Sequence, residues 1–294
     1  MKKESDLIKI ETHKVPQLDI RIRLSDYTPV IFKSIFSKKG IKKAIKKGWV
    51  TIDGDVGYTS DYIAGGETIE LFQSKTPQNK PIIDIPLEVI YEDEYLAIIN
   101  KPSGVVVSGN KKYILENALP NALKKSLKSD ALLRPEPIHR LDYPTSGALL
   151  IGKTTKVVIL LNKMFEERKI QKKYYAITIG VQKDSGFIET HIDDKPSKSE
   201  YRIISSLDSR KYESLNLVEL IPHTGRRHQL RIHLASIGNP ILGDINYGKE
   251  GLIGKGNGLY LHASSLAFTH PITESMVSVV IPLPKKFQKL FPKD

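Results

Sequence analysis

The stretch HRLDYPTSGALLI, residues 139–151, is the most informative part of this chain. It places one carboxylate, Asp142, between a basic pair and a Pro-Thr-Ser-Gly turn, and the apolar run Ala148–Ile151 follows directly. Turn chemistry at the edge of a strand lets a fold hold one side chain rigidly at the mouth of a cleft. The stretch therefore predicts a strand that begins near residue 148 and a reactive site built around Asp142.

A second block, TGRRHQLRIHL at residues 224–234, supplies a candidate partner for this carboxylate. An unpaired carboxylate in a dry cleft costs several kcal/mol, so an ionised Asp142 needs a positive neighbour. Arg227 and Arg231 are one helical turn apart and could share a face. We expect Arg231 to pair with Asp142. Taken without the first block, the same spacing would indicate two exposed helix arginines.

Both blocks resemble motifs of the RluA family of RNA pseudouridine synthases. The segments KPSG (101–104), QKKYYA (171–176) and GNPILGD (238–244) extend the resemblance. It implies that Asp142 is the catalytic nucleophile, that Arg231 is its ion-pair partner, and that Tyr174 stacks on the target base. On a strand, Tyr174 and Tyr175 face opposite sides, and the resemblance selects Tyr174 for the cleft, with Tyr175 packing in the core.

Further residues are expected to contact the substrate. The resemblance implies that Arg140 helps fill the gap that an extruded uridine leaves, and Arg227 is another candidate for contact with the RNA. His139 is a further candidate near the substrate, expected to support the loop by hydrogen bonding rather than to act as a base. Lys101 and Gly104 match an element that we interpret as structural.

The N-terminal region contains seven lysines and no acidic residue between Lys33 and Lys47. Within it, Ile41, Ala44 and Ile45 recur at helical spacing. A strand that ends in an Asp-Gly turn at residues 53–54 is expected next, followed by a second strand at residues 68–72. This pattern resembles the S-four-like RNA-binding domain, with Lys38 and Lys39 where an arginine is usual. A solvated charged face is the alternative; we favour RNA binding through four exposed lysines, Lys42, Lys43, Lys46 and Lys47.

The predicted organisation is an S-four-like domain at residues 1–73, a polar, Pro-containing linker at 74–86, and a pseudouridine synthase domain at 87–294. For the large domain we expect a hairpin at residues 87–99, a helix capped by Thr154 or Thr155, and strands at 173–179 and 276–281. Short turns between strands favour an α+β fold (mixed α/β) with a mixed, largely antiparallel sheet and flanking helices. The N-terminal domain is a small α/β unit.

Composition limits the possible partners. The net charge is +12 and the pI is near 9.5, which favours an anionic partner, although a merely soluble basic protein fits as well. There is no cysteine, no apolar run near the roughly 20 residues that span a bilayer, and no secretory signal pattern. We therefore expect a cytoplasmic protein, without a membrane partner and monomeric by default. His223, His228 and His233 do not converge on a regular element, so no metal site is expected.

The implied reaction detaches uracil from its ribose, turns it and rejoins it through a ring carbon. No redox change occurs, so no cofactor is expected. The predicted function is isomerisation of specific uridines in structured RNA, with large-subunit ribosomal RNA favoured. The alternatives are transfer RNA as substrate, or a non-catalytic RNA-binding or ribosome-assembly protein. A glycoside hydrolase would need a second carboxylate near Asp142, and none is indicated.

Overall fold

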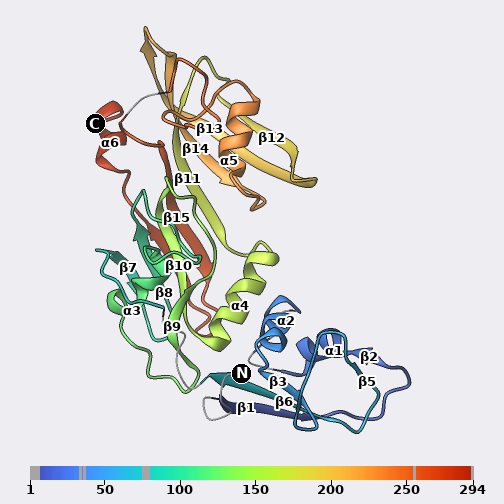
Figure 1. The fold of residues 1–294 in the computed structure, drawn as a ribbon. Coiled ribbons are helices and arrows are strands. Elements are labelled where there is room, and N and C mark those ends of the chain that lie inside the picture. The colour runs from blue at the N-terminus through green and yellow to red at the C-terminus, as the bar shows by residue number, and fades with distance from the viewer. Residues whose placement is uncertain (1–6, 33–34, 36–37, 75–79, 254–255, 293–294) are drawn as a thin grey trace. The chain divides into compact units, whose positions relative to one another are not determined.

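The protein is described from a computed structural model, which covers residues 7–32, 35, 38–74, 80–253 and 256–292. The chain divides into two compact units, Met1–Lys80 and Pro81–Asp294 (Figure 1). Residues 75–79 of the expected linker lie outside the described residues. No helix in the described part of the chain is long and apolar enough to cross a membrane.

The described part of the N-terminal unit has two small antiparallel sheets, one of four strands and one of two, and two helices. Four strands pair in the order β1-β6-β3-β4, and β2 pairs with β5. Asp53 and Gly54 both have positive φ, at 49° and 92°, as the predicted tight hairpin turn requires. The elements are β1 (Leu7–Lys14), β2 (Ile22–Arg23), α1 (Leu24–Ile31), α2 (Lys38–Lys46), β3 (Val50–Ile52), β4 (Asp55–Val56), β5 (Tyr62–Ile63) and β6 (Thr68–Ser74).

Helix α2 has the two-faced character that its sequence predicts. Ile41, Ala44 and Ile45 are 0%, 2% and 4% exposed and belong to the core of this unit. Four lysines on its other faces and just beyond its end are exposed: Lys42, Lys43, Lys46 and Lys47. Burial of the apolar stripe therefore fixes the helix and leaves a basic face in solvent.

The C-terminal unit is built on a ten-stranded sheet. Its main path runs β12-β13-β14-β11-β15-β10-β8-β7, with β16 beside β15 and β9 beside β10. The elements are β7 (Glu88–Glu92), β8 (Leu96–Lys101), a 3-10 helix (Leu115–Asn117), α3 (Leu119–Ala122), β9 (Ala131–Pro137), β10 (Ser146–Thr154), α4 (Thr155–Glu166), β11 (Gln171–Ile179), β12 (Ser185–Ile192), β13 (Lys195–Ser209), β14 (Glu213–Pro222), α5 (Gln229–Ser236), β15 (Leu261–Thr269), β16 (Met276–Val280) and α6 (Lys285–Leu290).

The sheet is mixed and largely antiparallel, as predicted. Among the described pairings of this sheet, only β10 with β15 is parallel. Strands β8 and β10 are interior strands of this sheet and are buried on both faces, with alternate residues in two different core clusters: Leu150 lies in one and Leu149 in the other. A strand that is covered on both faces has consecutive apolar residues, which explains the sequence ALLI at residues 148–151.

Helices α4 and α5 cover different parts of this sheet. Helix α4 packs on β10 and β9, and its cap is Thr154, whose Oγ1 accepts a hydrogen bond from the Val157 N–H. Helix α5 packs against β12, β13 and β14 (Figure 1). The two helices therefore lie over different parts of the sheet. Asp142 comes from the loop before β10, Arg231 from α5 and Tyr174 from β11.

Candidate active site

Asp142 lies on the turn between β9 and β10, and the buried side chain of Lys101 forms hydrogen bonds to this turn. Lys101 is fully buried, and its Nζ donates to the carbonyl oxygens of Pro102 at 2.9 Å and Thr145 at 2.7 Å. Burial lowers the pKa of Lys101 to about 8, against the opposing effect of the nearby Asp142 charge. The Thr145 N–H also donates to the Asp142 carbonyl at 3.0 Å. Lys101 therefore ties the end of β8 to the turn, in line with the structural interpretation of its motif.

Gly147 lets the chain pass from the turn into strand β10, next to β15. Its φ is +114°, and a Cβ at this position would lie 2.1 Å from the Ala263 carbonyl oxygen. Residues 146 and 147 form the parallel bridge to β15. Only glycine permits this close approach, so the PTSG segment fixes where Asp142 emerges from the sheet.

Arg231 is paired with Asp142, as expected. Its Nη1 donates to Asp142 Oδ2 at 3.3 Å, and its side chain is 3% exposed. Its other two nitrogens bind Asp244 in a bidentate pair, Nε to Oδ2 at 2.7 Å and Nη2 to Oδ1 at 2.8 Å. The backbone N–H groups of Asn246 and Tyr247 donate to Asp244 Oδ1. The guanidinium is thus held rigidly, with one edge left for Asp142.

The expectation that Arg227 and Arg231 share a helix face is wrong. Helix α5 begins at Gln229, and its N-cap residue, His228, has left-handed backbone angles with φ 56°. The chain therefore turns before the helix starts, and Arg227 is exposed and lies outside it. Sequence spacing alone could not reveal this turn.

His228 is brought to the site by the same turn. Its Nε2 lies 3.7 Å from Asp142 Oδ1, and its Nδ1 shares a 2.9 Å hydrogen bond with the Tyr247 hydroxyl. Burial lowers the pKa of His228 more than the Asp142 charge raises it. The ring therefore favours its neutral form beside the carboxylate. Tyr247 also lies against Arg231, with the guanidinium carbon 5.0 Å from the ring centroid.

Tyr174 lies on β11 near Asp142. Burial, together with the Asp142 charge, raises the pKa of its hydroxyl well above the usual range, so the hydroxyl stays neutral. Its ring packs against the core cluster that contains Leu141 and Ala263. Tyr175 was expected in the core; it is half-buried and packs there in part, and its hydroxyl donates to Glu219 Oε2 at 3.0 Å.

The two residues before Leu141 differ in their environments. The His139 Nε2 accepts a hydrogen bond from the Leu150 N–H at 3.1 Å, and its ring lies 5.0 Å from that of Phe165. Burial lowers the pKa of His139 to about 3, so it is neutral and supports the turn. Arg140 is exposed. Its contact with RNA stays a prediction, as do those of Arg227 and of the α2 lysines.

Sequence reasoning did not assign a role to Asp244, His228 or Tyr247. Asp244 is the last residue of the segment GNPILGD, which indicated the family but no role for this carboxylate, and the spacing of His228 was tested only for a metal site. The described residues contain no group of three or more His, Asp or Glu side chains placed to hold a metal ion. A buried arginine is stabilised by carboxylate partners. The acidic residue at the end of GNPILGD was therefore a candidate second partner for Arg231, and this was the signal that could have identified Asp244.

Comparison with known proteins identifies the family. The model of the RNA pseudouridylate synthase family matches residues 95–236. An uncharacterized RNA pseudouridine synthase of Aquifex aeolicus is 34% identical over 87% of this chain and 89% of its own length. A ribosomal large subunit pseudouridine synthase D of Xanthomonas campestris is 30% identical over 87% and 84%.

The fold agrees with this result. The solved structure of human RNA pseudouridylate synthase domain containing 4 superposes with a TM-score of 0.56 and 26% identity, covering 68% of this chain and 90% of that one. Together with the paired Asp142 and Arg231 beside Tyr174, these similarities show that the chain belongs to the RluA family of RNA pseudouridine synthases.

Proposed function

We propose that this RNA pseudouridine synthase isomerises uridine in large-subunit ribosomal RNA, with Asp142 as the nucleophile. The observation that carries the catalytic assignment is the 3.3 Å pair between Arg231 Nη1 and Asp142 Oδ2. The RNA assignment is supported by the relative named for the ribosomal large subunit and by the net charge of +12.

The arrangement of charges suits a carboxylate nucleophile. Asp244 occupies two nitrogens of Arg231, so the guanidinium gives Asp142 one hydrogen bond rather than a bidentate grip. The Asp142 side chain remains 24% exposed. The carboxylate thus pairs with a nearby cation and still presents an open oxygen, which nucleophilic attack requires.

The target atom cannot be reached inside a stacked helix, so the uridine has to be extruded at a cost of a few kcal/mol. Stacking on an aromatic ring contributes roughly 1–3 kcal/mol per base, and Tyr174 is placed near Asp142 to supply it. Phosphate contacts offset the remainder and make binding weaken steeply with salt. Arg140, exposed two residues before Asp142, is suited to fill the gap left in the RNA.

The test is a map of pseudouridine across all cellular RNA, in cells with the gene, without it, and with Asp142→Asn in its place. We expect one or more uridines of large-subunit ribosomal RNA to lose modification without the gene and to stay unmodified with Asp142→Asn. Loss confined to transfer RNA would overturn the ribosomal assignment and leave the reaction intact. Full modification with Asp142→Asn would overturn the nucleophile, and no change on any RNA would favour a binding protein without turnover.

The same proposal places the protein in the cytoplasm, acting as a monomer on RNA. Light scattering of the purified chain at micromolar concentration tests the second statement. A mass near 33.1 kDa is expected, and a mass twice as large would contradict it.

A further inference from the structure

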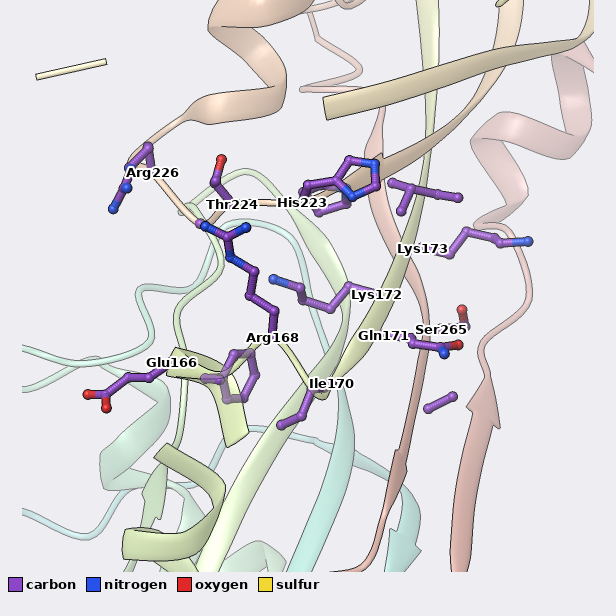
Figure 2. Close-up of a pocket in the computed structure, with 15 residues that line it drawn as sticks. Glu166, Arg168, Ile170, Gln171, Lys172, Lys173, His223, Thr224, Arg226 and Ser265 are labelled. Atoms are coloured by element: carbon purple, nitrogen blue, oxygen red, sulfur yellow. The ribbon is translucent and has the colours of Figure 1, made fainter. Parts of the chain in front are cut away.

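A basic cavity of about 710 Å³ lies in the C-terminal unit, outside the group of residues around Asp142 (Figure 2). Its walls come from the end of α4, the start of β11, the turn between β14 and α5, and part of β15. Asp142, Tyr174 and Arg231 do not line it. The catalytic arrangement described above therefore does not account for it.

Arg168 and Lys172 line this cavity without a carboxylate partner among the described residues, as does Arg226, which donates instead to a backbone carbonyl. In the described part of the chain, neither Arg168 nor Lys172 forms an ion pair with a carboxylate. Figure 2 shows the Lys172 amine and the Arg168 guanidinium on the same side of β11, whereas Lys173 points the opposite way. Lys173 pairs with Glu219 at 2.8 Å, as strand alternation would place it. Glu166, which also lines the cavity, is exposed and its carboxylate points away from Lys172 in Figure 2.

Lys172 is partly desolvated, which makes its lack of a counter-ion informative. Burial lowers its pKa, and no carboxylate offsets the effect. Its Nζ lies 5.6 Å from the centroid of the Phe165 ring, and the His139 ring lies 5.0 Å from the same centroid. With Lys172 and His139 both against it, the Phe165 ring is a poor platform for a base. The cavity is therefore suited to an anion rather than to a stacked nucleobase.

The cavity adjoins the reactive residues along two elements. Lys172 precedes Tyr174 by two residues on one face of β11, a separation of roughly 7 Å along a strand. Arg226, at the cavity wall, precedes His228 by two residues, and its Nε donates to the Pro196 carbonyl at 3.2 Å. An RNA strand with one nucleotide at Tyr174 would carry its neighbouring phosphates past this cavity.

We infer that the cavity binds the phosphodiester backbone flanking the target uridine, with Arg168 and Lys172 as the phosphate contacts. This inference rests on the proposed function, because it takes a uridine at Tyr174 and Asp142 as its reference point. It adds a binding site, separate from the reacting atoms, that holds the strand in place while the base is extruded.

The test compares RNA binding by the full chain and by three variants: Arg168→Gln, Lys172→Gln and the double variant. Lys169→Gln is the matched control, because Lys169 is exposed, follows Arg168 directly and pairs with Glu167 outside the cavity. The probe is a transcript of large-subunit ribosomal RNA, and its affinity is measured by fluorescence anisotropy at several salt concentrations.

Each phosphate contact contributes about 0.7 to the slope of log affinity against log salt for single strands. The double variant should lower the magnitude of this slope by about 1.4, so that a fourfold rise in salt weakens its binding about sevenfold less than it weakens the wild type. Each single variant should show about half of this decrease in slope. Lys169→Gln should keep the wild-type slope, and Lys172→Arg, which keeps the positive charge, should have a slope close to that of the wild type.

A second readout separates phosphate binding from a structural role. The single-turnover rate at saturating RNA should stay within about twofold of wild type, while the RNA concentration at half-maximal rate rises. A wild-type slope in the double variant overturns the inference. A lower saturating rate with an unchanged slope also overturns it, because the residues would then position the site. Wild-type protein that binds the transcript but makes no pseudouridine in it would instead refute the proposed substrate.

Discussion

Asp244→Asn tests how the reactive arginine is held. The substitution keeps the shape of the side chain but removes its charge. The native carboxylate accepts four hydrogen bonds, at 2.7 and 2.8 Å from Arg231 and at 3.0 and 3.1 Å from the N–H groups of Asn246 and Tyr247. An asparagine has one acceptor oxygen, and its NH2 group faces a donor. Arg231, 3% exposed, is left with Asp142 as its remaining carboxylate partner among the described residues.

The magnitude follows from this burial. Breaking a buried ion pair by removing one partner costs about 3–5 kcal/mol, and we expect a loss of this size in the free energy of unfolding. A 1 Å displacement of a catalytic group can reduce a rate about 100-fold, and Arg231 freed from Asp244 is expected to move by such a distance relative to Asp142. The single-turnover rate should therefore fall by about two orders of magnitude.

Unfolding is followed by far-UV circular dichroism in urea, because the single tryptophan, Trp49, lies in the N-terminal unit and does not report on the C-terminal one. The control is Asp208→Asn, which removes the same charge from an exposed position on β13 and should change stability by less than about 0.5 kcal/mol. A stability loss below about 1 kcal/mol with a wild-type rate in Asp244→Asn would show that Asp244 does not hold Arg231 in place.

Three other changes test separate parts of the account. Gly147→Ala forces a Cβ to within 2.1 Å of the Ala263 carbonyl oxygen at a φ of +114°, so urea unfolding should show a loss of more than about 2 kcal/mol. Tyr174→Leu removes the stacking ring, and kcat/KM on RNA should fall roughly 5- to 150-fold, the equivalent of 1–3 kcal/mol. Burial lowers the pKa of His262 to about 4. As the pH falls from about 6.5 to 4, the unfolded state therefore binds a proton that the folded state does not bind, and the free energy of unfolding should fall by up to roughly 3 kcal/mol. Urea titrations at each pH measure this loss.

Each of these changes has a matched control. Gly225→Ala should be tolerated, because a Cβ there meets nothing within 4 Å; equal losses at both glycines would contradict the packing argument. Tyr175→Phe should retain most of kcat/KM, and a loss as large as that of Tyr174→Leu would remove the distinction between the two faces of β11. His262→Gln should reduce the loss of stability at low pH, whereas His191→Gln, at an exposed site, should leave that loss unchanged. An equal loss in both variants would show that a group other than His262 causes it.

Local patterns predicted much of the fold. The Thr154 cap of α4 and the Asp-Gly turn at residues 53–54 both formed as the sequence indicated, because each depends on neighbours within a few residues. The order of strands in the large sheet was not predictable in this way. The parallel pairing of Gly147 with Ala263 joins residues far apart in the chain, and its register depends on a positive φ that no periodicity reveals.

The candidate site shows the same division. Asp142 and Arg231 were identified by the motifs in which they lie, and the structure brings them to 3.3 Å. The start of α5 was misjudged because His228 takes a left-handed conformation, which removes Arg227 from the helix. Asp244 was missed because its role depends on a contact with Arg231 across the loop that follows α5.

The most direct test of the account uses purified full-length protein and a large-subunit ribosomal RNA transcript in a single-turnover assay of pseudouridine formation. Wild-type protein should convert the target uridine, whereas Asp142→Asn should bind the transcript with similar affinity and form no detectable pseudouridine. Conversion by Asp142→Asn at the wild-type rate would contradict the assignment of this carboxylate as the nucleophile.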